Sequence, residues 1–259
     1  MRINVLVTSG GTVEKIDSVR SIANMSTGKL GSLIADGFGA EACVESVFYV
    51  CGESAVRPLS AKAVILPVGS VSDLENTLKS VFSDTNIDII VHSMAVSDYR
   101  VKSVTSAAAL AGALIASPDA AAFSGGRGSS AELAELIGAC APDFRAEGKI
   151  GSDIDDMLLL MERTPKVISL FSSMSPQSTL VGFKLLHNVP LEALIEKGFQ
   201  VLTQNGCSYV LANDLRDITG GQHVGYLIDR DNNYMRYSTK AEIAAAIVSA
   251  AIDCRGARV

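Results

Sequence analysis

The chain has 259 residues, of which 48% are hydrophobic and 19% charged, and a formal net charge of -6. This composition excludes a disordered or fibrous chain, and the length is enough to bury one sizeable core. The acidic balance argues against nucleic-acid binding, which needs a basic face for the phosphates. No apolar stretch reaches the about 20 residues that a membrane-spanning helix requires. We therefore expect a cytoplasmic enzyme domain that binds neither nucleic acid nor membrane.

The first predicted element is an apolar, β-branched strand at Ile3–Val7. It leads into Ser9-Gly10-Gly11-Thr12, whose glycines would let the backbone approach a ligand at the carboxyl end of the strand. A second cluster, Ser26-Thr27-Gly28-Lys29, precedes a helix whose N-terminal N–H groups could bind phosphate. Neither cluster matches the common dinucleotide or P-loop patterns. The alternative, that the glycines serve backbone geometry alone, stays open.

Strands and helices then alternate, which predicts an α/β fold with a Rossmann-like, doubly wound, mostly parallel sheet. Near the C-terminus, a polar turn between two short strands predicts a β-hairpin extension, and Thr239 to Glu242 form a capping box before a last helix. The predicted strands are Ile3–Val7, Ser46–Val50, Ala63–Leu66, Ile87–His92, Thr179–Phe183, Ser208–Ala212, Val224–Ile228 and Tyr234–Tyr237. The predicted helices are Leu30–Phe38, Val71–Phe82, Asp153–Met161 and Leu191–Leu202.

One segment, Val101–Gly148, breaks this rhythm because it is rich in Ala, Ser and Gly. Its centre, Ser124–Ser130, predicts a flexible hinge between short helices at Ala107–Ile115 and Ala131–Ile137. Long connections in compact domains are commonly lids or binding loops. We expect a single domain over residues 1–259, with a low-complexity insertion or lid at about 101–148.

Three further positions carry candidate chemistry. Asp98 follows the small residues after the strand Ile87–His92 and could hold a sugar hydroxyl or base edge, or alternatively cap a helix. Lys149 is either solvated surface or a partner for phosphate charge. Phe183 could stack on a base or pack in the core. The five widely spread cysteines form no Cys-x-x-Cys pair or zinc-ligand spacing, so we expect reduced thiols and no protein metal site.

The order of these motifs resembles the phosphopantothenate–cysteine ligase family, in its monofunctional bacterial form without a fused flavin decarboxylase domain. The resemblance covers nearly the whole chain apart from residues 101–148. Seven motifs between residues 8 and 215 carry it: Thr-Ser-Gly-Gly-Thr, Ile-Asp-Ser-Val-Arg-Ser-Ile-Ala-Asn, Ser-Thr-Gly-Lys, His-Ser-Met-Ala-Val-Ser-Asp-Tyr, Thr-Pro-Lys-Val-Ile, Val-Gly-Phe-Lys-Leu-Leu and Ala-Asn-Asp-Leu.

The resemblance implies that CTP or ATP, with Mg²⁺, activates the carboxylate of 4′-phosphopantothenate and releases pyrophosphate. L-Cysteine then displaces the nucleoside monophosphate. The family also implies a homodimer and, downstream, a separate phosphopantothenoylcysteine decarboxylase.

By position in the family motifs, three residues are implied in catalysis: Lys149 in the first half-reaction, Asn24 in stabilising the acyl-nucleotide, and Arg20 in holding the substrate. The implied binding residues are Gly10, Gly11, Ser26, Gly28, Gly31, Met94, Asp98, Pro165, Lys166, Val167, Phe183 and Lys197. The chain departs from the family in two places. Lys149-Ile150-Gly151-Ser152 stands where many members carry Lys-x-Lys-Lys, and Gln204 stands where a lysine is common.

Two other functions remain possible at this point. An NAD(P)-dependent oxidoreductase would show Gly-x-Gly-x-x-Gly after the first strand and an acidic residue at the end of the second strand. Neither is present, although Glu53 follows closely after the second strand. A nucleotide-binding module without catalysis would need Asn24 and Lys149 for binding only.

Overall fold

The computed structural model describes residues 2–119, 128–144 and 148–257. These residues form two compact units. The large unit consists of Met1–Thr12, Asn24–Val96 and Lys166–Val259, and the small unit of Val13–Ala23 and Ser97–Pro165. The assignment of residues 1–259 to one functional domain, with a lid at about 101–148, remains a prediction. Residues 124–127 of the expected hinge lie outside the described residues.

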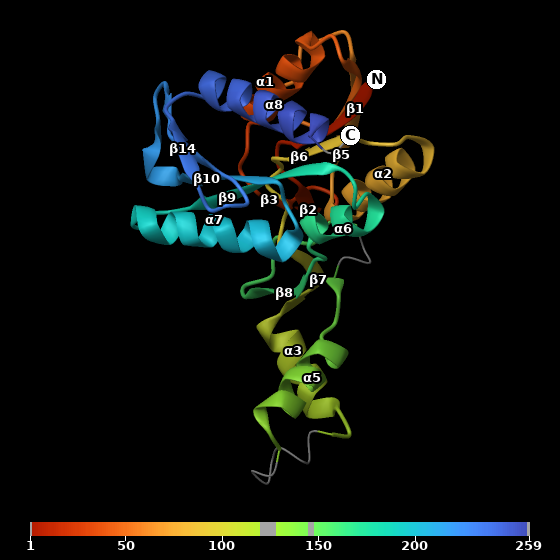
Figure 1. The fold of residues 1–259 in the computed structure, drawn as a ribbon. Coiled ribbons are helices and arrows are strands. Elements are labelled where there is room, and N and C mark those ends of the chain that lie inside the picture. The colour runs from red at the N-terminus through yellow and green to blue at the C-terminus, as the bar shows by residue number, and fades with distance from the viewer. Residues whose placement is uncertain (1, 120–127, 145–147, 258–259) are drawn as a thin grey trace. The chain divides into compact units, whose positions relative to one another are not determined.

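The large unit is built on a sheet of eight strands: β1 (Ile3–Ser9), β4 (Val44–Gly52), β5 (Ala63–Val68), β6 (Ile89–His92), β9 (Thr179–Leu186), β10 (Tyr209–Asp214), β13 (Gly225–Ile228) and β14 (Tyr234–Tyr237). Their order is β14-β13-β10-β9-β6-β1-β4-β5 (Figure 1). The strands from β10 to β5 are all parallel, and β13 and β14 add an antiparallel hairpin. The predicted Rossmann-like, doubly wound sheet with a C-terminal hairpin is confirmed.

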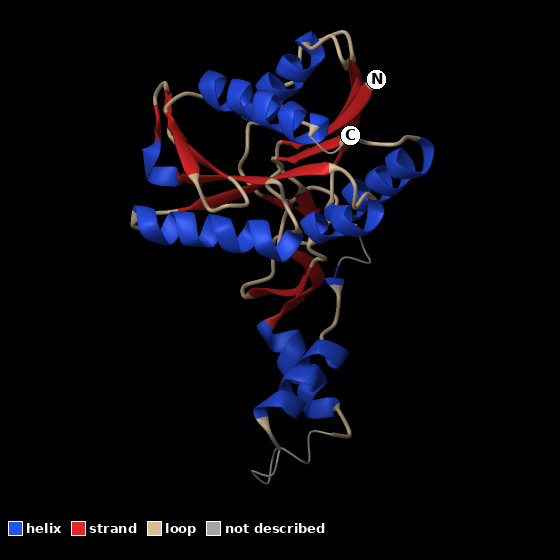
Figure 2. Cartoon of the chain, viewed as in Figure 1, coloured by secondary structure: helices blue, strands red, loops and turns tan. Residues whose placement is uncertain are grey.

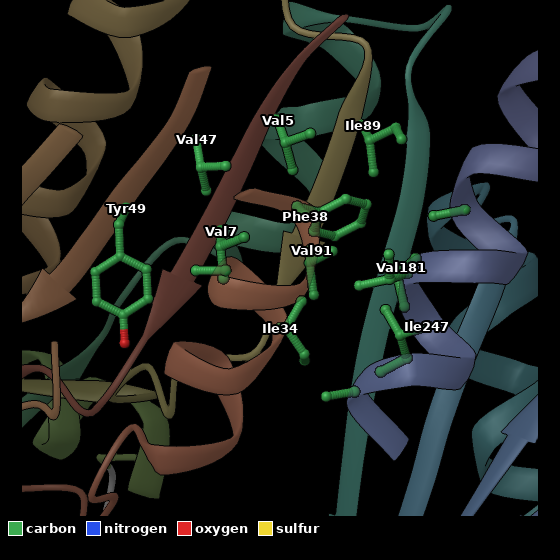
Figure 3. Close-up of a cluster of buried hydrophobic side chains, with 14 of the residues drawn as sticks. Val5, Val7, Ile34, Phe38, Val47, Tyr49, Ile89, Val91, Val181 and Ile247 are labelled. Atoms are coloured by element: carbon green, nitrogen blue, oxygen red, sulfur yellow. The ribbon is translucent and has the colours of Figure 1, made fainter. Parts of the chain in front are cut away.

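Helices cover both faces of this sheet (Figure 2). On one face, Ile34 and Phe38 of the first helix and Ile247 of the last pack against the sheet (Figure 3). Alternate residues of β1 face opposite sides, with Val5 in this cluster and Leu6 in the cluster on the other face. The helices of the large unit are α1 (Lys29–Ala40), α2 (Val71–Asp84), α6 (Val167–Met174), α7 (Leu191–Asn205) and α8 (Lys240–Gly256).

The sheet has β5 and β14 as its edges. β5 carries Pro67, and its Val64 and Ile65 side chains are partly exposed. Proline is tolerated at a sheet edge, where a missing backbone donor breaks few ladder bonds. The central strands lie between helices on both faces and hold the core.

The elements predicted for the large unit are present, with ends that differ by a few residues. Thr239 caps α8 by accepting a hydrogen bond from the backbone N–H of Glu242 (3.1 Å). The carboxylate of Glu242 accepts from the Ser238 N–H rather than from Thr239, so only half of the predicted capping box forms. The sequence did not predict β11 (Ile218–Thr219), β12 (Gln222–His223) or the 3₁₀ turn η2 (Leu215–Asp217).

The described residues of the small unit form two antiparallel ribbons and two short helices. Its core consists of Val101, Val104 and Ile150, with partly buried neighbours that include Ile16 and Ile22. The helices agree with the two short helices predicted within residues 101–148. The ribbons pair β2 (Val13–Lys15) with β3 (Ser21–Ala23) and β7 (Tyr99–Ser106) with β8 (Met157–Arg163), and the helices are α3 (Ala107–Ala116) and α5 (Ser130–Cys140).

The helix predicted at Asp153–Met161 is wrong. Residues Met157–Arg163 form β8, in which Leu159 lies opposite Val104 of β7. A short apolar run is compatible with either a helix or a strand, and pairing with a distant strand decides between them. The partner strand lies more than 50 residues earlier in the chain, so no local pattern could reveal it.

All five cysteines are free thiols. Within the described part of the chain, no helix is long and apolar enough to span a membrane.

Candidate functional site

The strands β1 and β6 lie side by side at the point where the winding direction of the sheet reverses. Beyond the two strands the backbone continues to pair, because Ala95 N donates to Gly10 O (2.8 Å) and Thr12 N donates to Ala95 O (3.2 Å). Ligands of open α/β sheets bind at the carboxyl ends of the strands at this point. The structure therefore brings the segments of Gly10, Gly11 and Met94 together at the expected edge.

Gly10 and Gly11 are required by the packing of this edge. Gly10 has a φ of 79°, and a Cβ there would lie 2.7 Å from Cβ of Ala55. A Cβ on Gly11 would lie 2.1 Å from the carbonyl oxygen of Asn24. Both positions thus have a structural reason to be glycine. Their contact with a ligand remains a prediction.

Residues 26–31, which comprise the turn before α1 and the first residues of that helix, are named the phosphate turn here. Gly28 is the N-cap with a φ of 69° and offers no side chain as a cap, the Lys29 N–H donates to Oγ1 of Thr27 at a long 3.4 Å, and the first turn contains no acidic residue. Gly31 lets the helix approach the strand ends, since a Cβ would lie 2.2 Å from Oγ of Ser9. Ser26 is exposed. Uncapped N–H groups at the positive end of a helix favour an anion, so the turn suits a phosphate.

Buried hydroxyl groups hold the phosphate turn in place. Oγ of Ser9 donates to the carbonyl oxygen of Gly28 (3.0 Å). The hydroxyl of Tyr49 donates to the carbonyl oxygen of Val56 (2.8 Å), and Val56 N donates to Thr27 O (3.0 Å). Burial raises the pKa of Tyr49 to about 12, so this hydroxyl remains a donor. The turn is therefore fixed to both β1 and the loop after β4.

Asn24 is exposed, and two hydrogen bonds fix its position. Its backbone N–H donates to Thr12 O (3.4 Å), and its Nδ2 donates to Val96 O (3.0 Å), which is 72 residues away in sequence. The amide is thereby anchored beside the extension of β6. An anchored, exposed amide can donate to a ligand without losing much conformational freedom.

The other predicted residues of the large unit differ in exposure. Met94 and Val167 are buried in the core, and Phe183 is partly buried against it. Lys166 is the exposed N-cap residue of α6. Lys197 lies on the exposed surface of α7, where its Nζ donates to Oε1 of Gln200 (3.0 Å). The role of each residue in nucleotide binding remains a prediction.

In the small unit, Arg20 belongs to a cluster around the carboxylate of Asp17. Nε and Nη2 of Arg20 donate to Oδ2 of Asp17 (2.9 and 2.6 Å), and Nη2 also donates to Ile150 O (2.8 Å). The Asp17 side chain is fully buried, whereas 39% of the Arg20 side chain is exposed. The guanidinium is thus fixed on one side and accessible on the other.

Lys149 is exposed, and the backbone on either side of it is bound to the same cluster. Gly148 O accepts from Ser18 N (3.3 Å), and Ile150 N donates to Oδ2 of Asp17 (3.3 Å). The structure therefore brings the segments of Arg20 and Lys149 together in the small unit, although they are about 130 residues apart in sequence.

In the small unit, Asp98 is bound to Thr164, the residue before Pro165. Thr164 N donates to Asp98 O (3.0 Å), and Oγ1 of Thr164 donates to Ser97 O (2.5 Å). Asp98 precedes the strand β7, so the alternative that it caps a helix is wrong. Its carboxylate is on an exposed residue, as ligand contact would require.

Sequence reasoning did not identify Asp17, Ser9 or Tyr49 as parts of these arrangements. Asp17 had a detectable signal, because an Asp whose carboxylate accepts from the N–H two residues later is typical of a turn. No local sequence signal marks the hydroxyl groups of Ser9 and Tyr49, since their acceptors lie on other segments.

A Rossmann-type sheet with a glycine turn at a helix N-terminus on its carboxyl edge defines a class of α/β proteins that bind phosphate-bearing ligands. Residues 1–109 match the model of the DNA/pantothenate metabolism flavoprotein C-terminal domain. The solved DNA/pantothenate metabolism flavoprotein from Streptococcus pneumoniae is 31% identical, with a TM-score of 0.76 over 95% of this chain and 97% of that chain. The chain belongs to this family, as its motifs predicted.

Two more distant relatives extend this comparison. The coenzyme A biosynthesis bifunctional protein CoaBC of Methanocaldococcus jannaschii is 25% identical over 246 residues, which are 94% of this chain and 49% of the relative. The chain spans about half the length of the curated relatives it matches. A mutant of Cab2, solved in complex with phosphopantothenate-cysteine, shares the fold at 19% identity and a TM-score of 0.66, over 99% of this chain and 87% of that chain. These findings do not favour the oxidoreductase alternative.

Proposed function

We propose that the chain is a phosphopantothenate–cysteine ligase of coenzyme A biosynthesis. Family membership supports this proposal, and so does the name of the CoaBC relatives. The observation that carries it is the anchored amide of Asn24 directly before the phosphate turn, at the sheet edge where ligands of this fold bind. Asn24 is the position that the family motif assigns to stabilising the acyl-nucleotide.

In the first half-reaction, a carboxylate oxygen of 4′-phosphopantothenate attacks the α-phosphorus of CTP or ATP, and pyrophosphate leaves. Negative charge accumulates on the phosphate oxygens as this happens. Lys149 and Arg20 supply the positive charge that offsets it. The fixed position of the Arg20 guanidinium supports its role in holding the substrate.

In the second half-reaction, the amine nitrogen of L-cysteine attacks the acyl carbon. The nucleoside monophosphate leaves and 4′-phosphopantothenoylcysteine forms. The amide N–H of Asn24 suits the stabilisation of the acyl-nucleotide between these steps, because it is a donor without charge.

The phosphate turn supplies Ser26, Gly28 and Gly31 for a phosphate group. Gly10 and Gly11 lie at the same edge of the sheet. The family motifs assign a further set of residues to nucleotide binding: Met94, Asp98, Pro165, Lys166, Val167, Phe183 and Lys197. The bacterial form of the motifs supports CTP as the preferred nucleotide.

The reaction implies Mg²⁺ as the ion that accompanies the nucleotide. Among the described residues, no group of three or more His, Cys, Asp or Glu side chains is placed to hold a metal ion. Mg²⁺ in nucleotide sites binds chiefly to phosphate oxygens and water. We therefore assign it no protein ligand. The same resemblance supports a homodimer, and a separate phosphopantothenoylcysteine decarboxylase as the enzyme that uses the product.

Pyrophosphate release tests this function. The purified protein is mixed with Mg²⁺, 4′-phosphopantothenate and either CTP or ATP, with and without L-cysteine. Pyrophosphate release that requires phosphopantothenate is the expected result. The nucleotide that gives the faster release is the one that the enzyme prefers. No release with either nucleotide would contradict the proposal.

A matched pair of lysine variants tests the role of Lys149. Lys149→Gln should slow pyrophosphate release by about 100-fold, because it removes a charge that stabilises the transition state. Lys102→Gln is the control, since Nζ of Lys102 donates to the carbonyl oxygen of Gly138 on α5 and has no assigned role in the reaction. Equal rates in the two variants would show that Lys149 is a solvated surface residue without a role in the reaction.

A further inference from the structure

The carboxylate of Asp17 accepts hydrogen bonds from five N–H groups although its side chain is fully buried. Oδ1 accepts from the backbone of Val19 (2.8 Å) and of Arg20 (2.7 Å). Oδ2 accepts from Nε and Nη2 of Arg20 and from the backbone of Ile150 (3.3 Å). A buried carboxylate with this many donors remains charged and holds its partners in fixed directions.

The electrostatics agree with this geometry. The backbone N–H of Val19, followed by the guanidinium of Arg20, holds the pKa of Asp17 well below its usual range, although burial acts to raise it. Asp17 is therefore ionised at physiological pH. Its charge is matched by Arg20, whose exposed side remains available to an anionic ligand.

The same contacts fix the backbone on both sides of Lys149. Arg20 and Asp17 bind the carbonyl and the N–H of Ile150, and Ser18 binds the carbonyl of Gly148. Lys149 is the one residue between these two anchors. Its direction therefore depends on a turn that lies about 130 residues earlier in the chain.

We propose that Asp17 is a positioning residue that sets Arg20 and Lys149 in place for the attack on the nucleotide. This inference rests on the proposed function. Asp17 touches no substrate, because its side chain is fully buried and its oxygens are occupied by protein donors. It acts through the guanidinium of Arg20 and through the backbone at Ile150.

Asp17→Asn tests the proposal, because it removes the charge and places an amide against N–H donors. The kcat of pyrophosphate release should fall about 10- to 100-fold, as expected when catalytic groups are misplaced by a fraction of an ångström to an ångström. Because part of the effect of Asp17 acts through Lys149, Asp17→Asn should lower kcat less in the Lys149→Gln background than in the wild type, and the loss that remains is the part that acts through Arg20. Strictly additive losses, or a wild-type kcat in Asp17→Asn, would overturn the proposal.

Asp88→Asn is the matched control. Asp88 is also a buried carboxylate that binds one arginine, Arg255 (2.8 Å), and one backbone N–H, that of Asn4 (2.9 Å), but it precedes β6 at the opposite end of the strand from the carboxyl edge. This variant should lower the melting temperature while leaving kcat at the wild-type value when both are measured well below that temperature. A kcat loss in Asp88→Asn as large as in Asp17→Asn would show a general effect of stability and sink the inference.

Amide hydrogen exchange gives a readout that does not depend on activity. In Asp17→Asn, residues 148–152 should exchange at least about tenfold faster than in the wild type, because Ile150 loses its acceptor. Asp88→Asn should leave that segment unchanged. If the wild type releases no pyrophosphate, the proposed function fails, and unchanged exchange in Asp17→Asn separately contradicts the positioning role. If Asp17→Asn does not fold, Asp17→Glu keeps the charge, displaces the carboxylate by one methylene, and is judged by the same measurements.

Discussion

Thr8 and His92 lie directly opposite each other on the central strands β1 and β6, and Oγ1 of Thr8 lies 2.7 Å from Nδ1 of His92. The imidazole is buried and meets the ring of Phe171 edge-on at 5.1 Å. Burial lowers the pKa of His92 to about 4. The ring is therefore neutral in the folded protein at physiological pH and serves as a hydrogen-bonding member of the core.

This pair predicts how stability depends on pH. The unfolded chain protonates His92 near its ordinary pKa of 6.5, whereas the folded chain does so only near pH 4. The folded protein therefore has its full stability, as far as His92 is concerned, above pH 6.5. That stability is lost as pH falls from about 6.5 to about 4, because the unfolded chain binds the proton more readily. The shift corresponds to about 3 kcal/mol in the free energy of unfolding. Urea unfolding at pH 7, 5.5 and 4 measures this change.

His92→Asn is the control for this prediction. The variant should be less stable at pH 7, but its stability should change much less between pH 6.5 and 4. Some dependence will remain, because burial and Lys240 also lower the pKa of His223. The carboxylates of Asp17 and Asp214, whose pKa values are held below the usual range by backbone N–H groups, contribute only below about pH 4. An unchanged slope in His92→Asn would show that another group dominates.

Gly11→Ala should disrupt the candidate site. The added Cβ would lie 2.1 Å from the backbone oxygen of Asn24, which therefore has to move. We expect a loss of about 1–3 kcal/mol in stability and a large loss of pyrophosphate release. Gly112→Ala is the control, because no atom lies within 4 Å of a Cβ at this position of α3. That variant should be more stable by about 0.5–1 kcal/mol and fully active.

Tyr49→Phe tests the support of the phosphate turn. It removes the hydroxyl that donates to Val56 O and leaves the ring in place. Stability should fall by about 1 kcal/mol, as is typical when one hydrogen bond is removed. The KM for the nucleotide should rise, because Val56 in turn binds the carbonyl of Thr27. Thermal unfolding measures the loss of stability, and steady-state kinetics measure the KM. An unchanged KM would show that the Tyr49 hydroxyl does not support nucleotide binding by the phosphate turn.

Asn24→Asp should leave nucleotide binding intact and lower product formation by about 100-fold, because a donor is replaced by a carboxylate. The new carboxylate also faces the carbonyl of Val96, to which the amide now donates. Asn4→Asp makes the same chemical change where Nδ2 of Asn4 donates to Asn86 O, and should leave turnover unchanged. Nucleotide affinity by calorimetry and product formation by mass spectrometry separate the two steps. Wild-type turnover in Asn24→Asp would remove its assigned role.

The sequence predicted the sheet because its evidence is local. The strand Ile3–Val7 is apolar apart from Asn4, since both of its faces are covered, and such runs alternate with amphipathic helices such as α2. The ribbon of β7 and β8 was not predicted, because its pairing joins residues more than 50 positions apart. Only the folded chain shows that Leu159 lies opposite Val104.

The candidate site was predicted as a set of positions but not as an arrangement. Gly28 of the phosphate turn is detectable because its left-handed backbone leaves few other residues possible. The bond from Asn24 to Val96 and the contacts of Asp17 with Ile150 join segments 72 and 133 residues apart. Nothing in the local sequence of Lys149 shows that a distant aspartate fixes its backbone.

The edge strand β5 carries Pro67, two residues after Ile65, and the side chains of Val64 and Ile65 are partly exposed. An exposed edge of β-branched residues is a surface on which strands of other molecules can add and start aggregation. Proline has no backbone N–H, so an incoming strand finds an incomplete ladder of donors along this edge. Pro67 thus protects the protein against self-association at the end of the sheet where no hairpin covers the parallel strands.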